Sequence, residues 1–234
     1  DIGIFSLQQS KLLTCGEGGI VTTNREDLAD LAWSLRHYGR TREGLWYEHV
    51  RLGWHYRMTE LQGALLLSQL VKMTEQNQRR SKNATALFQA LAEIPGIQAC
   101  RLNPETEQPA HYLVILRYDS KAWDGLPRPA LLAALEAEGI PAKSGYTFPI
   151  YENPLFRTLD FNNPKSPHWL GAEQPVNFAR YRGSCPVAEK ACREEAIWLT
   201  HELLLGTPDD ACDVARAFAK LYSQRGQIPR TTGD

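Results

Sequence analysis

Apolar and polar positions alternate over short distances at the start of the chain. The runs IGIFSL (residues 2–7) and GGIVTTN (residues 18–24) are rich in β-branched and aromatic residues, and a polar turn separates them. Residues 25–39 then carry apolar side chains at helical spacing and end at a glycine. The pattern predicts a strand, a turn, a second strand and a helix. Residues 40–55 mix charges with aromatic side chains in no regular period, which indicates an ordered but irregular loop.

Thr59 is predicted to open the longest helix, which runs for about 35 residues to a stop at Pro95 and Gly96. Its first half is apolar on nearly every side, so we expect it to be deeply buried. Its second half is amphipathic, so we expect it to lie on a surface. The apolar positions are Leu61, Leu65, Leu66, Leu67, Leu70 and Val71 in the first half, and Leu87, Phe88 and Leu91 in the second.

From Ile97 onward, strand-like and helix-like patterns alternate and indicate a second, smaller α/β unit. Strands are predicted in residues 97–102, 111–118 and 140–146, with a helix over residues 128–138 that Gly139 ends. Residues 157–170 are rich in proline and asparagine and are predicted to be irregular. Two closing helices are predicted, followed by a polar, frayed tail; they cover residues 185–199, 208–224 and 225–234.

Composition and charge narrow the classes of partner. The chain has 234 residues, 43% of them apolar, which is enough for a substantial core. Its 26 Lys and Arg nearly balance 27 Asp and Glu, so we expect small molecules or another protein as partners, rather than nucleic acid or an anionic membrane. We find no signal peptide and no membrane-spanning run, and expect a cytoplasmic protein. The five cysteines have no metal-site spacing and are interpreted as buried small residues.

Lys11 is the first candidate for chemistry. It follows Ser6 by five residues and precedes the segment GEGG at residues 16–19, where the first strand gives way to a turn. A lysine becomes a nucleophile where its surroundings favour the neutral amine, as Schiff-base lysines require. The Ser6 hydroxyl could bind a phosphate, and the glycines let the backbone approach a ligand. These are parts of a pyridoxal phosphate site, but the spacing alone leaves a surface lysine beside a hairpin turn as an open alternative.

Three motifs, in order along the chain, carry a resemblance to a known family. They are FSLQQSKLLTCGEGGIVTTN (residues 5–24), LGWHYRMTELQGALLLSQL (residues 52–70) and CPVAEKACREEAIWLTHELLLG (residues 185–206). The first is similar to the lysine motif of the DegT/StrS family of sugar and aminocyclitol aminotransferases. The second resembles the segment that leads into the family's long helix, and the third resembles its C-terminal helix. Together they span nearly the whole chain.

Carried over residue by residue, the resemblance implies the cofactor site. Lys11 would form the Schiff base with pyridoxal 5′-phosphate and shuttle the proton, and Ser6 would bind the cofactor phosphate. Arg57 or His55 would cross a dimer interface and reach the partner subunit's phosphate. The family usually has Asn at the position of His55, so the resemblance carries over no fixed role for this imidazole. No metal is expected.

Finer detail resembles one branch of the family. The segments QQSK, GYTFPIYENPLF and WLTHELLLG look most like the glutamine-dependent scyllo-inosose aminotransferases. This implies amino transfer from L-glutamine or L-glutamate to a cyclic ketone, either an inosose or a keto-sugar. Tyr146, Tyr151 and His37 are candidates for substrate contact, or alternatively for packing. His201 is interpreted as a core histidine and Glu17 as a cap of its own turn.

The resemblance also implies the architecture. The chain would be the C-terminal part of a fold type I aminotransferase of the α/β class, acting as a homodimer. Residues 1–95 would end the large cofactor-binding domain and include the long connecting helix, residues 96–224 would form the small α/β domain, and 225–234 the tail. Asp1 lies inside a predicted strand, which indicates a cut through a larger protein, and the resemblance implies that about half of the enzyme precedes Asp1. The missing part would hold the ring-stacking aromatic and the Asp for the pyridine nitrogen, and we expect residues 1–234 alone to be inactive.

Three alternatives stay open within this resemblance. One is a nucleotide-sugar aminotransferase. Another is a sugar 3-dehydratase, against which Lys11 argues because those enzymes have His at that position. The last is a non-catalytic homologue that uses the fold for dimerisation or sensing; intact Ser6, Lys11 and GEGG disfavour it, whereas the His55 substitution leaves it open.

Overall fold

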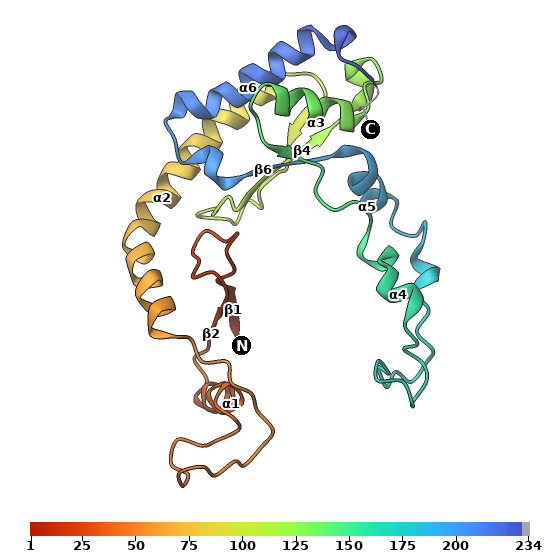
Figure 1. Ribbon diagram of the computed structural model, residues 1–234. Coiled ribbons are helices and arrows are strands. Elements are labelled where there is room, and N and C mark those ends of the chain that lie inside the picture. The colour runs from red at the N-terminus through yellow and green to blue at the C-terminus, as the bar shows by residue number, and fades with distance from the viewer. Residues whose placement is uncertain (231–234) are drawn as a thin grey trace. The chain divides into compact units, whose positions relative to one another are not determined.

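The computed structural model describes residues 1–230, and the chain divides into two compact units (Figure 1). Unit 1 comprises residues 1–78 and unit 2 begins at Arg79. The division falls inside one continuous helix, α2 (Glu60–Ala92). The predicted domain boundary near Pro95 stays a prediction. Among the described residues, no helix is both long enough and apolar enough to span a membrane.

Unit 1 begins with the predicted hairpin. Strands β1 (Gly3–Ser6) and β2 (Gly19–Thr22) pair antiparallel, with Gly3 opposite Thr22 and Ser6 opposite Gly19. Helix α1 (Glu26–Arg36) follows, and the chain then runs without a further helix or strand to Thr59, as the sequence predicted. Thr59 opens α2 through a capping box. Its hydroxyl accepts from the Gln62 N–H at 3.3 Å, and the Gln62 amide oxygen accepts from the Thr59 N–H at 2.9 Å.

The first half of α2 is not buried, contrary to the prediction. Leu61 and Val71 are 84% and 85% exposed, and Leu65, Leu67 and Leu70 are exposed as well. Leu66 alone of the six predicted apolar positions is buried, in a small cluster with Leu7 and Cys15. A helix packed on one side buries only one stripe of residues, so the apolar residues on its other sides remain in solvent.

Unit 2 is built on a four-stranded antiparallel sheet in the order β3-β4-β6-β5. The strands are β3 (Ile97–Ala99), β4 (Leu113–Tyr118), β5 (Ala142–Lys143) and β6 (Ala196–Thr200). Alternate residues of the central strands are buried, among them Val114 and Leu116 on β4 and Ile197 and Leu199 on β6.

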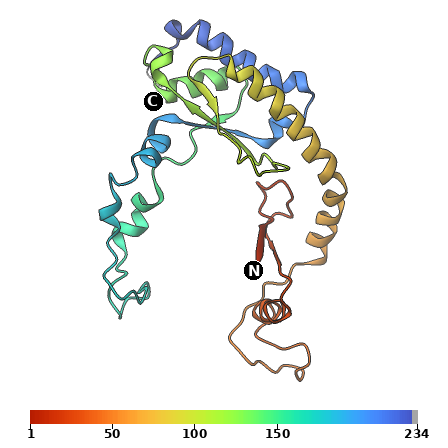
Figure 2. The ribbon, with the colours of Figure 1, turned by 180° about the vertical axis from the view of Figure 1, so that it is seen from behind.

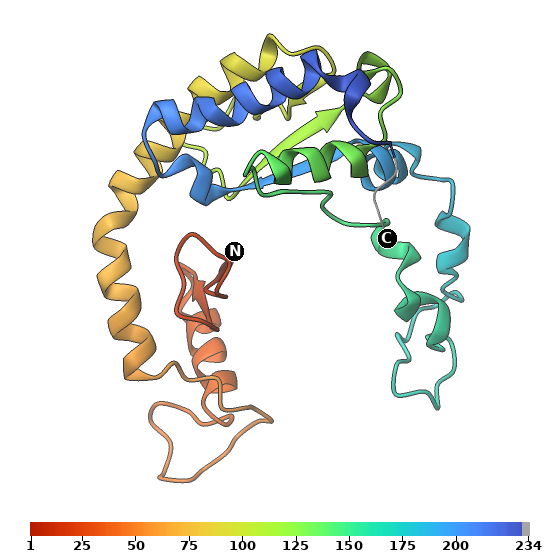
Figure 3. The same ribbon diagram turned by 45° about the horizontal axis from the view of Figure 1, so that its top comes forward.

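Three helices cover the buried face of this sheet. The second half of α2, α3 (Arg128–Ala137) and α6 (Pro208–Ser223) contribute to a single core with the strands (Figure 3). Trp123 and Phe218 are fully buried there, as is Leu87 of α2. The amphipathic second half of α2 therefore lies on the surface with one stripe buried, as predicted. Helices α3 and α6 also confirm their predictions, and Gly139 follows α3 with a φ of +82° that favours glycine.

The predicted closing helix over residues 185–199 is wrong in its second half. Helix α5 (Pro186–Lys190) passes through a π-helical turn at Ala191–Glu195 into β6, an inner strand of the sheet. The buried guanidinium of Arg128 ends the turn by donating to backbone carbonyls at 2.7–3.4 Å, those of Ser144, Ala191, Cys192, Arg193 and Ala196. Burial of alternate residues in β6 outweighs the local helical spacing.

A long excursion, residues 144–190, leaves the sheet after β5 and returns before β6 (Figure 2). It contains α4 (Pro154–Thr158) in its first half and ends with α5, and residues 159–177 have no regular structure. The excursion confirms the predicted irregular segment and extends beyond it.

Two smaller predictions need correction. Cys15 is buried, but Cys100 and Cys185 are exposed, so they are not core residues. The predicted frayed tail is packed as far as Arg230. Arg225 pairs with Asp124 at 2.9 Å, Ile228 packs against the core, and Arg230 donates to the Asp124 carbonyl at 2.8 Å. Residues 231–234 lie outside the described residues.

Candidate active site

Residues 7–18, which we call the lysine loop, connect β1 to β2 and carry Lys11. Backbone bonds close the loop on itself. The Leu7 N–H donates to Gly18 at 2.9 Å, and the Cys15 N–H donates to Leu7 at 3.1 Å. Gly18 has a φ of +152°, and a Cβ there would lie 3.2 Å from the Cys15 sulfur. The glycine thus allows the loop to close tightly at the start of β2.

Lys11 and Ser6 lie at the same end of β1. The Lys11 N–H donates to the Gln8 carbonyl at 2.9 Å, and the Gln8 N–H lies 3.4 Å from the Ser6 hydroxyl oxygen. Ser6 is exposed, and Lys11 is half-buried. The turn therefore brings the backbone of Lys11 back toward the end of β1, where Ser6 lies.

The first turns of α2 hold the lysine loop through one face of the helix. Gln62 donates to the Glu17 carbonyl at 2.8 Å, and Leu66 packs against the loop's apolar residues. Gln69 accepts from the Thr14 N–H at 3.1 Å and donates to the Thr14 carbonyl at 2.7 Å. These three positions are four and three residues apart, which places them on one side of a helix.

A second group of candidates forms around Arg57. His37 and His55 are opposite each other in an isolated antiparallel bridge that joins the end of α1 to the chain before α2. His55 and Arg57 are two residues apart, and on an extended chain such side chains point to the same side. The Arg57 side chain therefore reaches both imidazoles. Its guanidinium lies 3.2 Å from Nδ1 of His37 and 3.0 Å from Nε2 of His55. We call these three residues the Arg57 cluster.

Charge and burial both act on the Arg57 cluster. Desolvation lowers the pKa of His37, and the positive charges of Arg57, Arg40 and Arg36 lower it further. A neutral imidazole can accept from the guanidinium, which is the arrangement observed. The guanidinium also lies over the Tyr38 ring, 5.3 Å from its centroid. The cluster therefore concentrates positive charge on Arg57, as a site for an anion requires.

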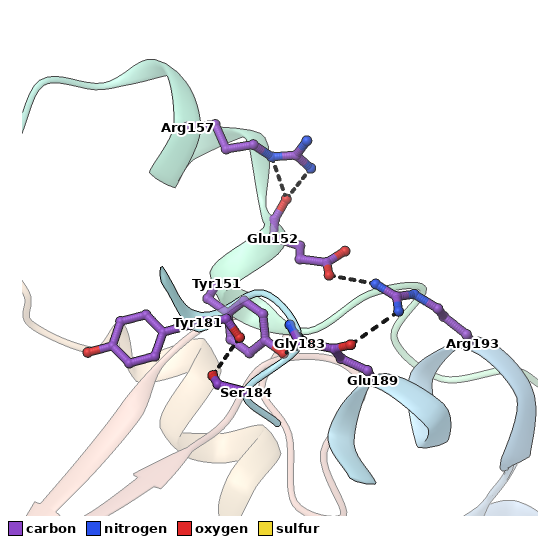
Figure 4. Close-up of polar contacts among 8 residues, drawn as sticks. All are labelled: Tyr151, Glu152, Arg157, Tyr181, Gly183, Ser184, Glu189 and Arg193. Atoms are coloured by element: carbon purple, nitrogen blue, oxygen red, sulfur yellow. Dashed lines mark hydrogen bonds and ion pairs between the residues drawn. The ribbon is translucent and has the colours of Figure 1, made fainter. Parts of the chain in front are cut away.

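Tyr151 belongs to a polar network that anchors the excursion (Figure 4). Its hydroxyl donates to Glu189 of α5 at 2.6 Å, and the Gly183 N–H donates to the same carboxylate oxygen at 2.6 Å. Arg193 bridges Glu189 and Glu152, at 3.3 and 2.5 Å. These hydrogen bonds, led by that from Tyr151, lower the pKa of Glu189, and burial together with the bond to Glu189 raises the pKa of Tyr151.

Tyr146, the other tyrosine candidate, lies elsewhere in unit 2. It is 72% exposed, and its ring meets Trp198 of β6 edge to face, with the centroids 5.0 Å apart. Gly145 makes this approach possible, because a Cβ there would lie 2.5 Å from the Trp198 ring. The two tyrosines have different surroundings: Tyr146, at the start of the excursion, lies against Trp198 of β6, whereas Tyr151 binds Glu189 of α5.

The remaining candidates have structural surroundings. His201 is largely buried, 3.5 Å from Glu202 and beside the Tyr112 ring, as expected for a core histidine. The contact that the structure gives Glu17 uses its backbone carbonyl, which accepts from Gln62, rather than its carboxylate. The sequence analysis missed Gln62, Gln69 and Glu189. The spacing of the two glutamines around Leu66 was a usable signal, whereas nothing in the sequence pairs Glu189 with Tyr151.

The donors present fit the cofactor that the resemblance implied. A phosphate needs hydrogen-bond donors, and Ser6 offers an exposed hydroxyl at the end of the hairpin, opposite Gly19. An aldehyde needs a primary amine, which Lys11 supplies in the lysine loop. The Arg57 cluster adds a separate cationic position suited to a phosphate.

Relatives of this chain are named for one reaction. A Micromonospora echinospora protein, provisionally named L-glutamine:3-amino-2,3-dideoxy-scyllo-inosose aminotransferase, is 34% identical over 99% of this chain and 55% of its own length. The L-glutamine:scyllo-inosose aminotransferase of Streptomyces griseus is 33% identical over 97% of this chain and 54% of its own length. The chain thus spans about half the length of the curated relatives it matches.

Solved structures agree with the fold. A 3-amino-5-hydroxybenzoic acid synthase is 26% identical, with a TM-score of 0.76, over 96% of this chain and 55% of that one. The S. venezuelae protein DesV, solved with a ketimine intermediate, is 28% identical, with a TM-score of 0.72, over 94% and 51%. The chain has the fold of part of a fold type I aminotransferase, a class that uses pyridoxal phosphate.

The family itself is settled by the match along the chain. Residues 1–218 match the profile of the DegT/DnrJ/EryC1/StrS aminotransferase family, so the match includes the lysine loop, the Arg57 cluster and the four-stranded sheet. The resemblance inferred from the three sequence motifs is therefore confirmed, and the chain belongs to the DegT/DnrJ/EryC1/StrS aminotransferase family.

Proposed function

We propose that this chain is the lysine-bearing part of a pyridoxal phosphate-dependent aminotransferase. The reaction moves an amino group from L-glutamine or L-glutamate to a cyclic ketone, an inosose or a keto-sugar. One observation carries the proposal: Lys11 lies in the loop that follows Ser6 at the end of β1, in a chain with relatives named for glutamine:inosose amino transfer.

Each residue has a proposed task in this reaction. When bound, pyridoxal phosphate carries the amino group between the two substrates and withdraws electrons from the bond that breaks. Lys11 holds the cofactor through Nζ, and the same nitrogen would move a proton between the substrate carbon and the C4′ carbon of the cofactor in each half-reaction. The Ser6 hydroxyl donates to the phosphate.

Arg57 and His55 are proposed to act across a homodimer. The guanidinium would bind the phosphate in the partner subunit's site, and the two histidines would hold it in place. The exposed apolar residues of α2 support an association that covers them, since contiguous exposed apolar surface commonly marks an interface. We expect the enzyme to work in the cytoplasm, in keeping with five free thiols.

Tyr146 is our first candidate for substrate contact, because its ring is exposed and lies against Trp198 of β6. Tyr151 and His37 come after it, since Glu189 and Arg57 already engage their polar atoms. The substrate-binding roles of all three are proposals that follow from the sequence resemblance.

Labelling tests the lysine. The full-length protein that contains this chain is incubated with pyridoxal phosphate and reduced with borohydride. The labelled peptides are then identified by mass spectrometry. We expect the reduced adduct on Lys11, its loss in Lys11→Ala, and full labelling in Lys72→Ala, which changes an exposed lysine of α2. An adduct on other lysines alone would contradict the proposal and favour the non-catalytic homologue.

An acceptor screen tests the substrate class. With L-glutamine labelled at the α-amino nitrogen, we expect transfer of the isotope to scyllo-inosose and its deoxy forms. Transfer to nucleotide-linked keto-sugars alone would favour the alternative branch of the family. Equal rates from L-glutamate would leave the reaction class intact and remove the preference for glutamine.

A further inference from the structure

We propose that Gln69 is a positioning residue for Lys11, a role that rests on the proposed function of that lysine. Gln69 lies on α2, 58 positions beyond Lys11 in the sequence. Its side chain meets the lysine loop at Thr14, three residues after Lys11. Gln69 would hold the lysine in place and would take no part in the chemistry of the amine.

The Gln69 amide pairs with Thr14 as one strand pairs with another. It accepts from the backbone N–H at 3.1 Å and donates to the backbone carbonyl at 2.7 Å of the same residue. Two bonds to a single residue restrain both the position and the rotation of that part of the backbone. Both contacts are partly buried, so losing Gln69 would leave two backbone groups poorly solvated.

The restraint reaches Lys11 through the closure of the loop. The Thr14 hydroxyl donates to the Leu7 carbonyl at 3.0 Å and accepts from the Gly16 N–H at 3.0 Å. The Cys15 N–H donates to the same Leu7 carbonyl. Lys11 thus lies midway in a span whose two ends are tied together, and Gln69 fixes that tied point on α2.

Gln69 differs from the other two residues of this face. Gln62 divides its side chain between the cap at Thr59 and the Glu17 carbonyl, and Leu66 contributes apolar burial without direction. Both contacts of Gln69 are directional, and both go to the loop. A long helix is a rigid base for such contacts, so the backbone around Lys11 is held by an element outside the loop.

The expected consequence falls on the chemical step. A displacement of about 1 Å at a reacting group can cost about a hundredfold in rate. Loosening the loop should therefore lower kcat while leaving KM for the amino donor within about twofold, since no substrate contact is removed.

The test compares Gln69→Met with Gln78→Met in the native protein. Methionine has nearly the length of glutamine without its amide, and Gln78 is an exposed glutamine of the same helix. In Gln69→Met we expect hydrogen exchange at the Thr14 amide to rise about tenfold. We also expect the fraction of Lys11 labelled with cofactor by borohydride to fall, and the pH dependence of this labelling to shift. Gln78→Met should match the wild type in all three.

Gln69→Glu gives a second variant. A carboxylate still accepts from the Thr14 N–H but donates nothing to the carbonyl. The exchange rate of the Thr14 amide and the labelling of Lys11 should therefore be intermediate between those of the wild type and of Gln69→Met. Unchanged labelling at Lys11 in Gln69→Met, with wild-type labelling intact, would overturn the inference and leave the proposed function standing. Absence of label on Lys11 in the wild type would overturn the proposed function and the inference with it.

Discussion

The two halves of α2 have similar apolar content but opposite surroundings. In the second half Ala84, Leu87 and Leu91 are buried in the core of unit 2. In the first half Leu61 and Val71 stand in solvent. Apolar residues in a helix therefore indicate that this part of the helix favours burial. They do not indicate whether the covering residues belong to the same chain.

The same difference separates the two units. Unit 2 has one continuous core of strands and helices, whereas the core cluster of unit 1 consists of Leu7, Cys15 and Leu66, with Leu13 beside them. Unit 1 relies instead on polar contacts between α2 and the lysine loop. We expect unit 2 to be the more stable of the two, and three predictions test this comparison.

The largest effect is expected at Arg128, which ends the π-helical turn before β6. Arg128→Met removes hydrogen bonds to five backbone carbonyls and leaves buried acceptors without a donor. We expect a loss of about 4 kcal/mol in the free energy of unfolding of unit 2. Urea denaturation followed by hydrogen exchange in β4 measures it. Arg101→Met, at an exposed arginine, is the control, and an equal loss there would contradict the role of Arg128.

A matched pair of leucines tests the comparison within α2 itself. Leu87→Ala should cost about 3 kcal/mol, because a fully buried leucine leaves a cavity. Leu67→Ala, at a position that is 68% exposed, should cost less than about 0.5 kcal/mol in the chain alone. The same denaturation assay serves both. A large cost at Leu67 would mean that its half of the helix is covered in solution.

The smallest effect on stability is expected at Glu189, because ion pairs and hydrogen bonds, rather than a hydrophobic core, hold this part of the excursion. The pKa of Glu189 is lower in the folded chain than its usual value of about 4.3, so its contribution to stability is present above that pH. This contribution is lost as the pH falls through the lower, folded value. Between pH 5 and pH 3, the protection of amides around Gly183, measured relative to their intrinsic exchange rates at each pH, should fall about threefold.

Substitution tells whether Glu189 is the group responsible for this acid effect. Glu189→Gln should remove much of the pH dependence at Gly183, because an amide does not titrate. Glu136→Gln, at an exposed glutamate of α3, should leave it unchanged. An identical acid response in Glu189→Gln would assign the effect to another carboxylate of the network.

Local signals were sufficient to predict much of the fold. The hairpin, α1, α3, α6 and the long helix were all predicted from periodicity and from their start and stop residues. The second half of the predicted helix at residues 185–199 failed because β6 is stabilised by pairing with β4, far away in sequence. The exposed half of α2 could not be predicted either, since the pattern carries no information about the covering partner.

The candidate site divides in the same way. Lys11, Ser6, His55 and Arg57 became candidates through the resemblance of two motifs to a known family, because spacing alone left Lys11 open. The joining of His37 to Arg57 and the contact of Gln69 with Thr14 depend on how separate segments pair. Such contacts between segments depend on the fold. Spacing within one segment can indicate the face of a helix that makes contact, but it does not identify the residue contacted on the other segment.

The Arg57 cluster has a consequence for the protons it carries. A guanidinium has only N–H donors, so Nδ1 of His37 and Nε2 of His55 must each present a lone pair. The two rings are therefore opposite tautomers, with the proton on Nε2 in His37 and on Nδ1 in His55. The backbone N–H of Arg57 lies 3.4 Å from Nδ1 of His55, and this longer contact is the alternative to the 3.0 Å bond at Nε2, because a neutral imidazole has a single acceptor nitrogen. With both lone pairs turned toward the guanidinium, the three side chains present hydrogen-bond donors to their surroundings, which supports the proposed anion site.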